Sequence, residues 1–142
     1  LYANDRTSDA QRTAANDILA AVSVVEWVAQ EDLLDAVTAV SGSGPAYFFL
    51  FMEAMIDAGV AQGLSRETAT QLTLQTALGA AKLASNSEVD VVELRRQVTS
   101  PNGTTEQAIR SFEASELRAT VAKAMDACAD RSRAMASELG AH

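Results

Sequence analysis

The stretch Gln97–Ala108 carries the residue types that could hold a small ligand. Its sequence is Gln-Val-Thr-Ser-Pro-Asn-Gly-Thr-Thr-Glu-Gln-Ala. Pro-Asn-Gly favours a tight turn, because Asn and Gly both tolerate positive φ. A helix is predicted to start directly afterwards, since Thr104 is a suitable N-cap and Gln107 completes a Thr-x-x-Gln capping box.

Such a turn offers donors for an anion. The backbone N–H groups from Gly103 to Glu106 are expected to lack helical acceptors, and the hydroxyls of Ser100, Thr104 and Thr105 accompany them. Free N–H groups at the positive end of a helix dipole favour a small anion such as a carboxylate. The alternative, and the commoner case, is a plain connection between two helices with a good cap.

Composition argues against several other kinds of site. Of the 142 residues 48% are hydrophobic and only 5% aromatic, which is typical of closely packed helices in one domain. The net charge of −8 argues against a nucleic-acid partner, because phosphate binding needs a basic face. One cysteine, Cys128, excludes an internal disulfide and a thiolate metal cluster. The single histidine is His142, so no histidine catalyst and no metal site is predicted.

The first 28 residues differ from the rest. Leu1-Tyr2-Ala3 and Ser23–Val28 are predicted to be strands around a helix that Ser8 and Gln11 start with a capping box. Strand–helix–strand is the end of an α/β domain, and two strands are not stable alone, so we expect a larger domain to precede this chain. Without a signal peptide at the start or a run of about 18 apolar residues, the default is a cytoplasmic protein that does not enter the membrane.

Helical periodicity continues after Gln30. The predicted helices cover Glu31–Val40, Pro45–Gln62, a segment capped by Ser65, Glu88–Val98, Thr104–Ala114 and a last helix from Ser115 to about Ala136. Pro45–Gln62 is apolar on all sides and is therefore expected to be buried, in a core or between subunits. The predicted fold is mainly α: an all-helical domain after a short strand–helix–strand segment.

Two motifs give this chain a resemblance to a known family. Asp35–Tyr47, Asp-Ala-Val-Thr-Ala-Val-Ser-Gly-Ser-Gly-Pro-Ala-Tyr, and Gln97–Thr105 resemble the signatures of pyrroline-5-carboxylate reductase, and Arg131-Ser132-Arg133 matches a third, weaker one. The spacing agrees over the whole chain. Asn102 departs from the family pattern, where glycine is usual, but Asn is the best non-glycine residue for positive φ.

The resemblance implies an activity and an assembly. The family reduces L-1-pyrroline-5-carboxylate to L-proline with NADPH or NADH, the last step of proline synthesis, and its helical C-terminal domain interlocks with a second copy. A homodimer, or a larger oligomer of dimers, is therefore expected. By the same resemblance, residues 1–28 end the dinucleotide-binding domain and residues 29–142 form the dimerisation and substrate-binding domain. No G-x-G-x-x-G loop stands in the sequence, so the chain alone is expected to be inactive.

The resemblance also assigns roles to single residues. It places the substrate carboxylate at the turn and puts other residues near the substrate or the cofactor. The implied substrate residues are Ser100, Gly103, Thr104, Thr105, Glu31 and Thr38, and the implied cofactor residue is Gln97. An imine needs no protein nucleophile; it must be protonated or hydrogen-bonded at nitrogen and held against the nicotinamide ring. Thr105 is our choice for that bond, with the N–H groups of Gly103 and Thr104 on the carboxylate.

Two other functions compete with this one. A sister reductase acting on β-hydroxyacids would need a lysine on the apolar helix, and residues 45–62 contain none. A non-catalytic helical dimerisation module would explain the helices but would leave the two signatures unexplained.

Overall fold

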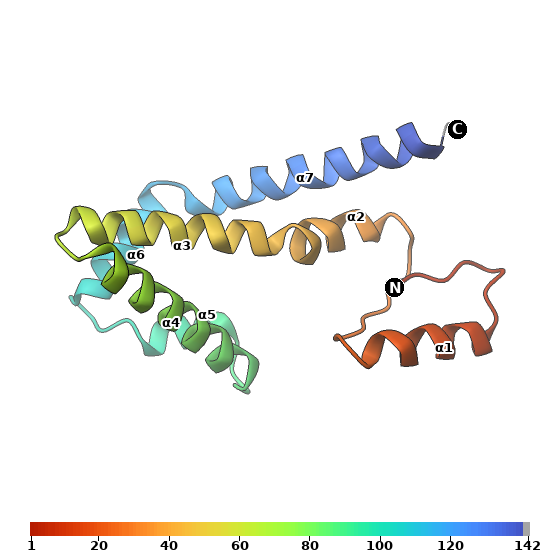
Figure 1. Cartoon of the computed structure of the whole chain (residues 1–142), viewed down its shortest axis with the longest axis horizontal. Coiled ribbons are helices and arrows are strands. Elements are labelled where there is room, and N and C mark those ends of the chain that lie inside the picture. The colour runs from red at the N-terminus through yellow and green to blue at the C-terminus, as the bar shows by residue number, and fades with distance from the viewer. Residues whose placement is uncertain (141–142) are drawn as a thin grey trace. The chain divides into compact units, whose positions relative to one another are not determined.

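The computed structural model describes residues 1–140, and in this range the chain is helical without any β-strand (Figure 1). No helix within residues 1–140 is long and apolar enough to cross a membrane. The elements are α1 (Asp9–Ala20), α2 (Leu33–Val37), the π-helical turn η1 (Thr38–Gly42), α3 (Gly44–Ala61), α4 (Arg66–Ser85), α5 (Val91–Gln97), α6 (Thr104–Ala114) and α7 (Leu117–Gly140). They form two compact units, one made of Leu1–Gly44 and the chain from Lys123 on, the other of Pro45–Ala122.

In the first unit, α1 starts as predicted. The Ser8 N–H donates to Oε1 of Gln11 at 2.9 Å, and the Gln11 N–H donates to Oγ of Ser8 at 3.3 Å. This reciprocal pair is the capping box, and it satisfies donors that the first turn of a helix leaves open.

The predicted strands on either side of α1 are absent, so the expected strand–helix–strand segment is wrong. The two segments meet only where Val28 N–H donates to the Leu1 carbonyl at 2.8 Å and the Leu1 amine donates to the Glu26 carbonyl. The β-branched pattern that predicted a strand does not form one, because a strand needs a continuous ladder of partners. Instead Trp27 turns to α1, where its Nε1 donates to Oδ1 of Asn16 at 3.2 Å and the Arg12 guanidinium lies 4.7 Å from its ring centroid.

The helix predicted for Glu31–Val40 forms as α2 followed by η1. The Ser43 N–H donates to the Thr38 carbonyl at 2.8 Å, five residues back, which is the π-helical spacing. The hydroxyls of Thr38 and Ser41 each donate at 2.9 Å to a carbonyl four residues earlier, those of Leu34 and Val37. Such bonds compete with the regular backbone ladder, which is consistent with the wider turn.

The second unit contains α4, α5 and α6, which form close to where they were predicted. Ser65 caps α4 by accepting from the Thr68 N–H at 3.1 Å. Helices α3 and α4 approach closely, since a Cβ added at Gly59 would lie 3.3 Å from that of Ala69. Phe51 of α3 and Phe112 of α6 pack with ring centroids 6.0 Å apart.

The start of the last helix differs from the prediction. Ser115 is the C-cap of α6 and does not start the last helix, which begins at Leu117. Glu116, at φ 54, reverses the chain between the two helices. Arg118 then holds Glu113 with Nε and Nη2 both 2.9–3.1 Å from its carboxylate. This hydrogen bonding lowers the pKa of Glu113 and raises that of Arg118.

Few side chains are buried in this chain by itself. Among residues 1–140 only Ala39 and Ala69 are buried hydrophobic residues. On α3, Phe48, Phe49 and Leu50 are each about two-thirds exposed, at 67%, 66% and 67%. The apolar helix that the sequence predicted to be buried is therefore not covered within the chain, and three adjacent large apolar residues need another surface.

Candidate functional site

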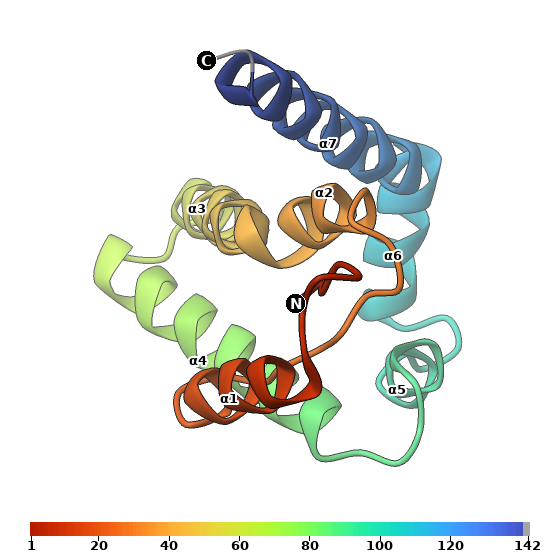
Figure 2. The ribbon, with the colours of Figure 1, turned by 90° about the vertical axis from the view of Figure 1, so that its right-hand side faces the viewer.

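The candidate site is the connection between α5 and α6 in the second unit (Figure 2). Helix α5 ends at Gln97, and Thr99 closes it by donating its hydroxyl to the Arg95 carbonyl at 2.6 Å and its N–H to the Arg96 carbonyl at 3.0 Å. Two carbonyls at the end of α5 thus accept hydrogen bonds, which fixes the direction in which the chain enters the turn.

The turn itself spans Ser100 to Gly103. The Gly103 N–H donates to the Ser100 carbonyl at 3.0 Å. Pro101 occupies the second position and Asn102, at φ 59, the third. Proline followed by a residue with positive φ is what a type II turn requires. The prediction that Asn102 supports positive φ is confirmed.

Helix α6 has the predicted bounds, Thr104–Ala114, but its N-cap lies one residue earlier than predicted. Its N-cap is Gly103, at φ −84 and ψ 173, and Thr104 is its first helical residue, so the Thr104–Gln107 capping box is wrong. The expectation that the Gly103 N–H is free is also wrong, because the turn uses it. Since the N-cap carries no side chain and makes no side-chain bond, the N–H groups of Thr104 and Thr105 at the helix start have no helical acceptor.

Three hydroxyls accompany these donors. Ser100, Thr104 and Thr105 are all exposed, and in the part of the chain that the structure describes their hydroxyls make no hydrogen bond. Gly103 contributes by its lack of a side chain, since a Cβ there would lie 3.0 Å from the Ser100 carbonyl oxygen. The turn therefore brings together free N–H groups and free hydroxyls at the positive end of a helix, which suits a small anion.

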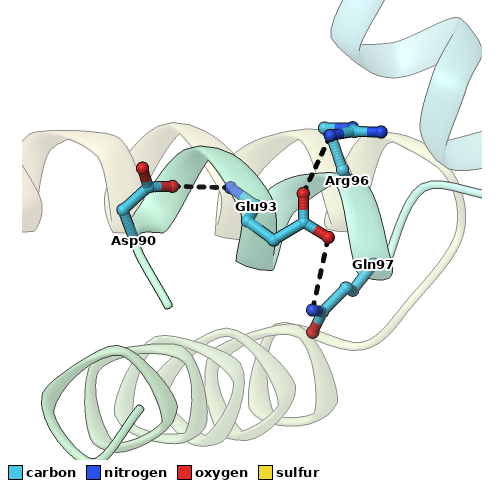
Figure 3. A network of polar contacts seen from close by, with 4 residues as sticks. All are labelled: Asp90, Glu93, Arg96 and Gln97. Atoms are coloured by element: carbon cyan, nitrogen blue, oxygen red, sulfur yellow. Dashed lines mark hydrogen bonds and ion pairs between the residues drawn. The ribbon is translucent and has the colours of Figure 1, made fainter. Parts of the chain in front are cut away.

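Gln97 is held within α5. Its Nε2 donates to Oε1 of Glu93 at 3.4 Å, and Oε2 of the same carboxylate accepts from Nη1 of Arg96 at 2.9 Å (Figure 3). The Glu93 N–H donates in turn to Oδ1 of Asp90, which is the N-cap of α5. This network orients the Gln97 amide and leaves its carbonyl oxygen available.

Glu31 and Thr38 belong to the first unit, so the structure does not assign them to the turn. Glu31 precedes α2 and is exposed. Thr38 opens η1, and its hydroxyl donates to the Leu34 carbonyl. Their place near the substrate stays a prediction. Within residues 1–140 no three His, Cys, Asp or Glu side chains are grouped so as to hold a metal ion.

Sequence reasoning missed Glu106. In the observed register it is the third residue of α6, and its Oε2 accepts from the Asn102 N–H at 2.5 Å. Its Oε1 accepts from Nη2 of Arg110 at 2.7 Å. The signal was present in the sequence, since a Glu three residues after the N-cap commonly reaches back to the backbone. With Thr104 as the predicted cap, the third helical position falls on Gln107, which hides the role of Glu106.

Comparisons with known proteins agree on one family. The family profile described as "Pyrroline-5-carboxylate reductase dimerisation" matches residues 31–135. A pyrroline-5-carboxylate reductase from Pseudomonas aeruginosa is 59% identical over 140 residues, which is 99% of this chain and 51% of that protein. One from Haemophilus influenzae is 44% identical over 136 residues, covering 95% and 50%.

Solved structures agree as well. A pyrroline-5-carboxylate reductase from Coxiella burnetii has a TM-score of 0.88 and 48% identity, covering 93% of this chain and 49% of that one. A Plasmodium falciparum pyrroline carboxylate reductase with NADP bound has a TM-score of 0.83 and 36% identity, covering 93% and 50%. The chain thus spans about half the length of the curated relatives it matches.

Proposed function

The chain belongs to the pyrroline-5-carboxylate reductase dimerisation family, and from this premise we propose that it is the helical half of an enzyme that reduces L-1-pyrroline-5-carboxylate to L-proline. The observation that carries the proposal is the family match over residues 31–135, which includes the whole turn between α5 and α6. In this proposal residues 29–142 are the dimerisation and substrate-binding domain, and residues 1–28 end the dinucleotide-binding domain. The enzyme works in the cytoplasm.

The turn would hold the substrate by its carboxylate. The N–H groups of Thr104 and Thr105 supply hydrogen bonds at the start of α6, where the helix dipole favours negative charge. The hydroxyls of Ser100 and Thr104 add donors that no other group occupies in residues 1–140. The absence of a Cβ at Gly103 keeps the Ser100 carbonyl in place. A carboxylate held in this way fixes the ring of the substrate relative to Thr105.

Thr105 would act at the ring nitrogen. Reduction of the C=N bond places a hydride on carbon and a proton on nitrogen, and the nicotinamide cofactor supplies the hydride when it is bound. The free hydroxyl of Thr105 donates a hydrogen bond to the lone pair of the neutral imine nitrogen and stabilises the negative charge that develops there as the hydride reaches carbon, and the nitrogen then takes its proton from water. Holding the substrate in the reactive orientation is the main contribution of this chain.

The chain's own residues fit a cofactor only in part. NADPH or NADH needs a phosphate-binding loop, and no G-x-G-x-x-G motif stands in the sequence. The remaining half of the enzyme, as long as this chain in the relatives, would hold the phosphates. Gln97, oriented by Glu93, would offer its amide carbonyl to the cofactor.

A homodimer completes the proposal, with larger assemblies of dimers allowed. The exposed Phe48, Phe49 and Leu50 of α3 supply an apolar surface of the kind that an obligate interface buries. Two other functions are disfavoured. A β-hydroxyacid reductase of this architecture would need a lysine on α3, which has none. A purely structural dimerisation module would not need the donors gathered at the turn.

The test uses the complete protein that contains this chain. With NADPH or NADH, it should consume L-1-pyrroline-5-carboxylate and yield proline, measured by loss of cofactor absorbance and by amino-acid analysis. Residues 1–142 alone should dimerise and show no turnover. Turnover of a β-hydroxyacid but not of pyrroline-5-carboxylate would refute the proposal.

A further inference from the structure

One side chain outside the predicted site contacts the turn between α5 and α6. Asn102 stands at φ 59, a conformation that costs free energy for any residue with a Cβ. Its N–H points to Glu106 and is accepted there at 2.5 Å. Because the acceptor is ionised, this bond is stronger than a bond between neutral groups.

Glu106 is well placed to be rigid. Its side chain is 25% exposed, the lowest value among the acidic partners of the ion pairs in residues 1–140. One oxygen holds Asn102 and the other holds Arg110 at 2.7 Å, so both oxygens are engaged. Arg110 also compensates the negative charge, which would otherwise oppose an anion at the start of α6.

The contact replaces the usual capping-box bond, which this turn does not allow. In an ordinary capping box the residue at the third helical position bonds the N-cap N–H. Here the N-cap is Gly103, and its N–H already donates to Ser100. Glu106 therefore reaches one residue further back, to Asn102, and ties the strained position of the turn to the helix that presents the donors.

We propose that Glu106 is a positioning residue: it holds Asn102 in the left-handed conformation and thereby fixes the N–H groups of Thr104 and Thr105 toward the substrate carboxylate. The proposal rests on the proposed function of the turn. Both carboxylate oxygens of Glu106 are engaged by Asn102 and Arg110, so in this proposal Glu106 acts on substrate binding through Asn102. Glycine at position 102 adopts positive φ without strain, and an enzyme with glycine there would not need Glu106.

This dependence gives a specific test in the complete enzyme. Glu106→Ala should raise KM for pyrroline-5-carboxylate about tenfold, the scale of one lost charge-assisted hydrogen bond, with kcat changed less than twofold and KM for the cofactor unchanged. Glu106→Gln keeps an acceptor oxygen and should lie between the wild type and Glu106→Ala. In the double variant with Asn102→Gly, KM should return to within about twofold of that of Asn102→Gly alone.

Glu113→Ala is the matched control. It removes another glutamate of α6 that pairs with an arginine, at the end away from the turn. It should leave KM for the substrate unchanged. An unchanged KM in Glu106→Ala, or a double variant as impaired as Glu106→Ala, would overturn the positioning role.

A second measurement separates this inference from the proposed function. Amide hydrogen exchange measured at the Asn102 N–H itself, for example by NMR, reports this contact whether or not the enzyme turns over. Glu106→Ala should speed that exchange at least tenfold, and Glu113→Ala should not. If Glu106→Ala exchanges faster but the protein does not reduce pyrroline-5-carboxylate, the proposed function is refuted and the Glu106–Asn102 contact is supported. If exchange is unchanged in Glu106→Ala and the enzyme is active, the contact is refuted.

Discussion

Adding one methyl group at Gly103 should damage both the fold and the site. A Cβ there would lie 3.0 Å from the carbonyl oxygen of Ser100 and 3.3 Å from its Cβ. Gly103 has φ −84, which any residue adopts, so the obstacle is the contact and not the dihedral angle. The same carbonyl accepts the Gly103 N–H at 3.0 Å, so the methyl group can be accommodated only by opening the turn.

The size of the effect follows from these contacts. Losing one turn hydrogen bond costs about 0.5–1.5 kcal/mol, and crowding in a tightly packed place costs about 1–3 kcal/mol. Both describe the same displacement and are not added. We therefore expect Gly103→Ala to lower the free energy of unfolding by about 1–3 kcal/mol. Opening the turn should also move the N–H groups of Thr104 and Thr105 away from the substrate carboxylate. This displacement should raise KM for pyrroline-5-carboxylate about tenfold, the equivalent of about 1.4 kcal/mol.

The assay compares Gly103→Ala with Gly79→Ala in the complete enzyme. Gly79 lies inside α4, and an added Cβ meets no atom of the chain within 4 Å. There the same methyl group should stabilise the helix by about 0.5–1 kcal/mol. Chemical denaturation is done at one protein concentration, since the stability of a dimer depends on it. Equal stability of the two variants, with wild-type KM for Gly103→Ala, would refute this account of the turn.

Three further predictions address other parts of the molecule. Thr105→Ala should lower kcat/KM for pyrroline-5-carboxylate about tenfold, the scale of one hydrogen bond of 1–2 kcal/mol, while Thr105→Ser keeps the hydroxyl and most of the activity; equal kinetics for both variants would remove the hydroxyl from the reaction. Phe49→Glu on α3 should raise the dimer dissociation constant at least tenfold in light scattering, because it places a charge on an apolar interface, and an unchanged dimer would exclude Phe49 from it. Hydrogen bonds from Arg118 lower the pKa of Glu113, so their stabilisation is present above the unfolded-state pKa and is lost as the pH falls through the folded-state pKa. The Tm difference between the wild type and Glu113→Gln should therefore be largest at neutral pH and vanish in acid, and a difference that persists in acid would have another origin.

Much of the helical fold could be predicted from local chemistry. The capping pair of Ser8 and Gln11, the cap at Ser65 and the bounds of α6 follow from sequence signals that act within a few residues. The strands around α1 could not be predicted correctly, because a β-branched pattern such as that of Ser23–Val28 becomes a strand only where other strands supply a ladder.

The candidate site was predicted in part. Its place, its hydroxyls and the positive φ of Asn102 follow from the sequence Ser-Pro-Asn-Gly-Thr-Thr. The position of the N-cap could not be predicted from the sequence. Thr104 and Gly103 both suit an N-cap, and only the turn hydrogen bond to Ser100 decides between them. The one-residue shift also explains why the role of Glu106 was invisible until the structure was known.

The scarcity of buried side chains has a consequence for how the protein is made. With Ala39 and Ala69 as the only buried hydrophobic residues among those described, a single chain has little to hold it folded before it meets a partner. Refolding should then speed up with rising chain concentration, and newly synthesised copies at low abundance should be degraded by proteases. A variant that still pairs but carries a damaged turn would draw normal copies into mixed assemblies, so that its harm in a cell would exceed its share of the chains.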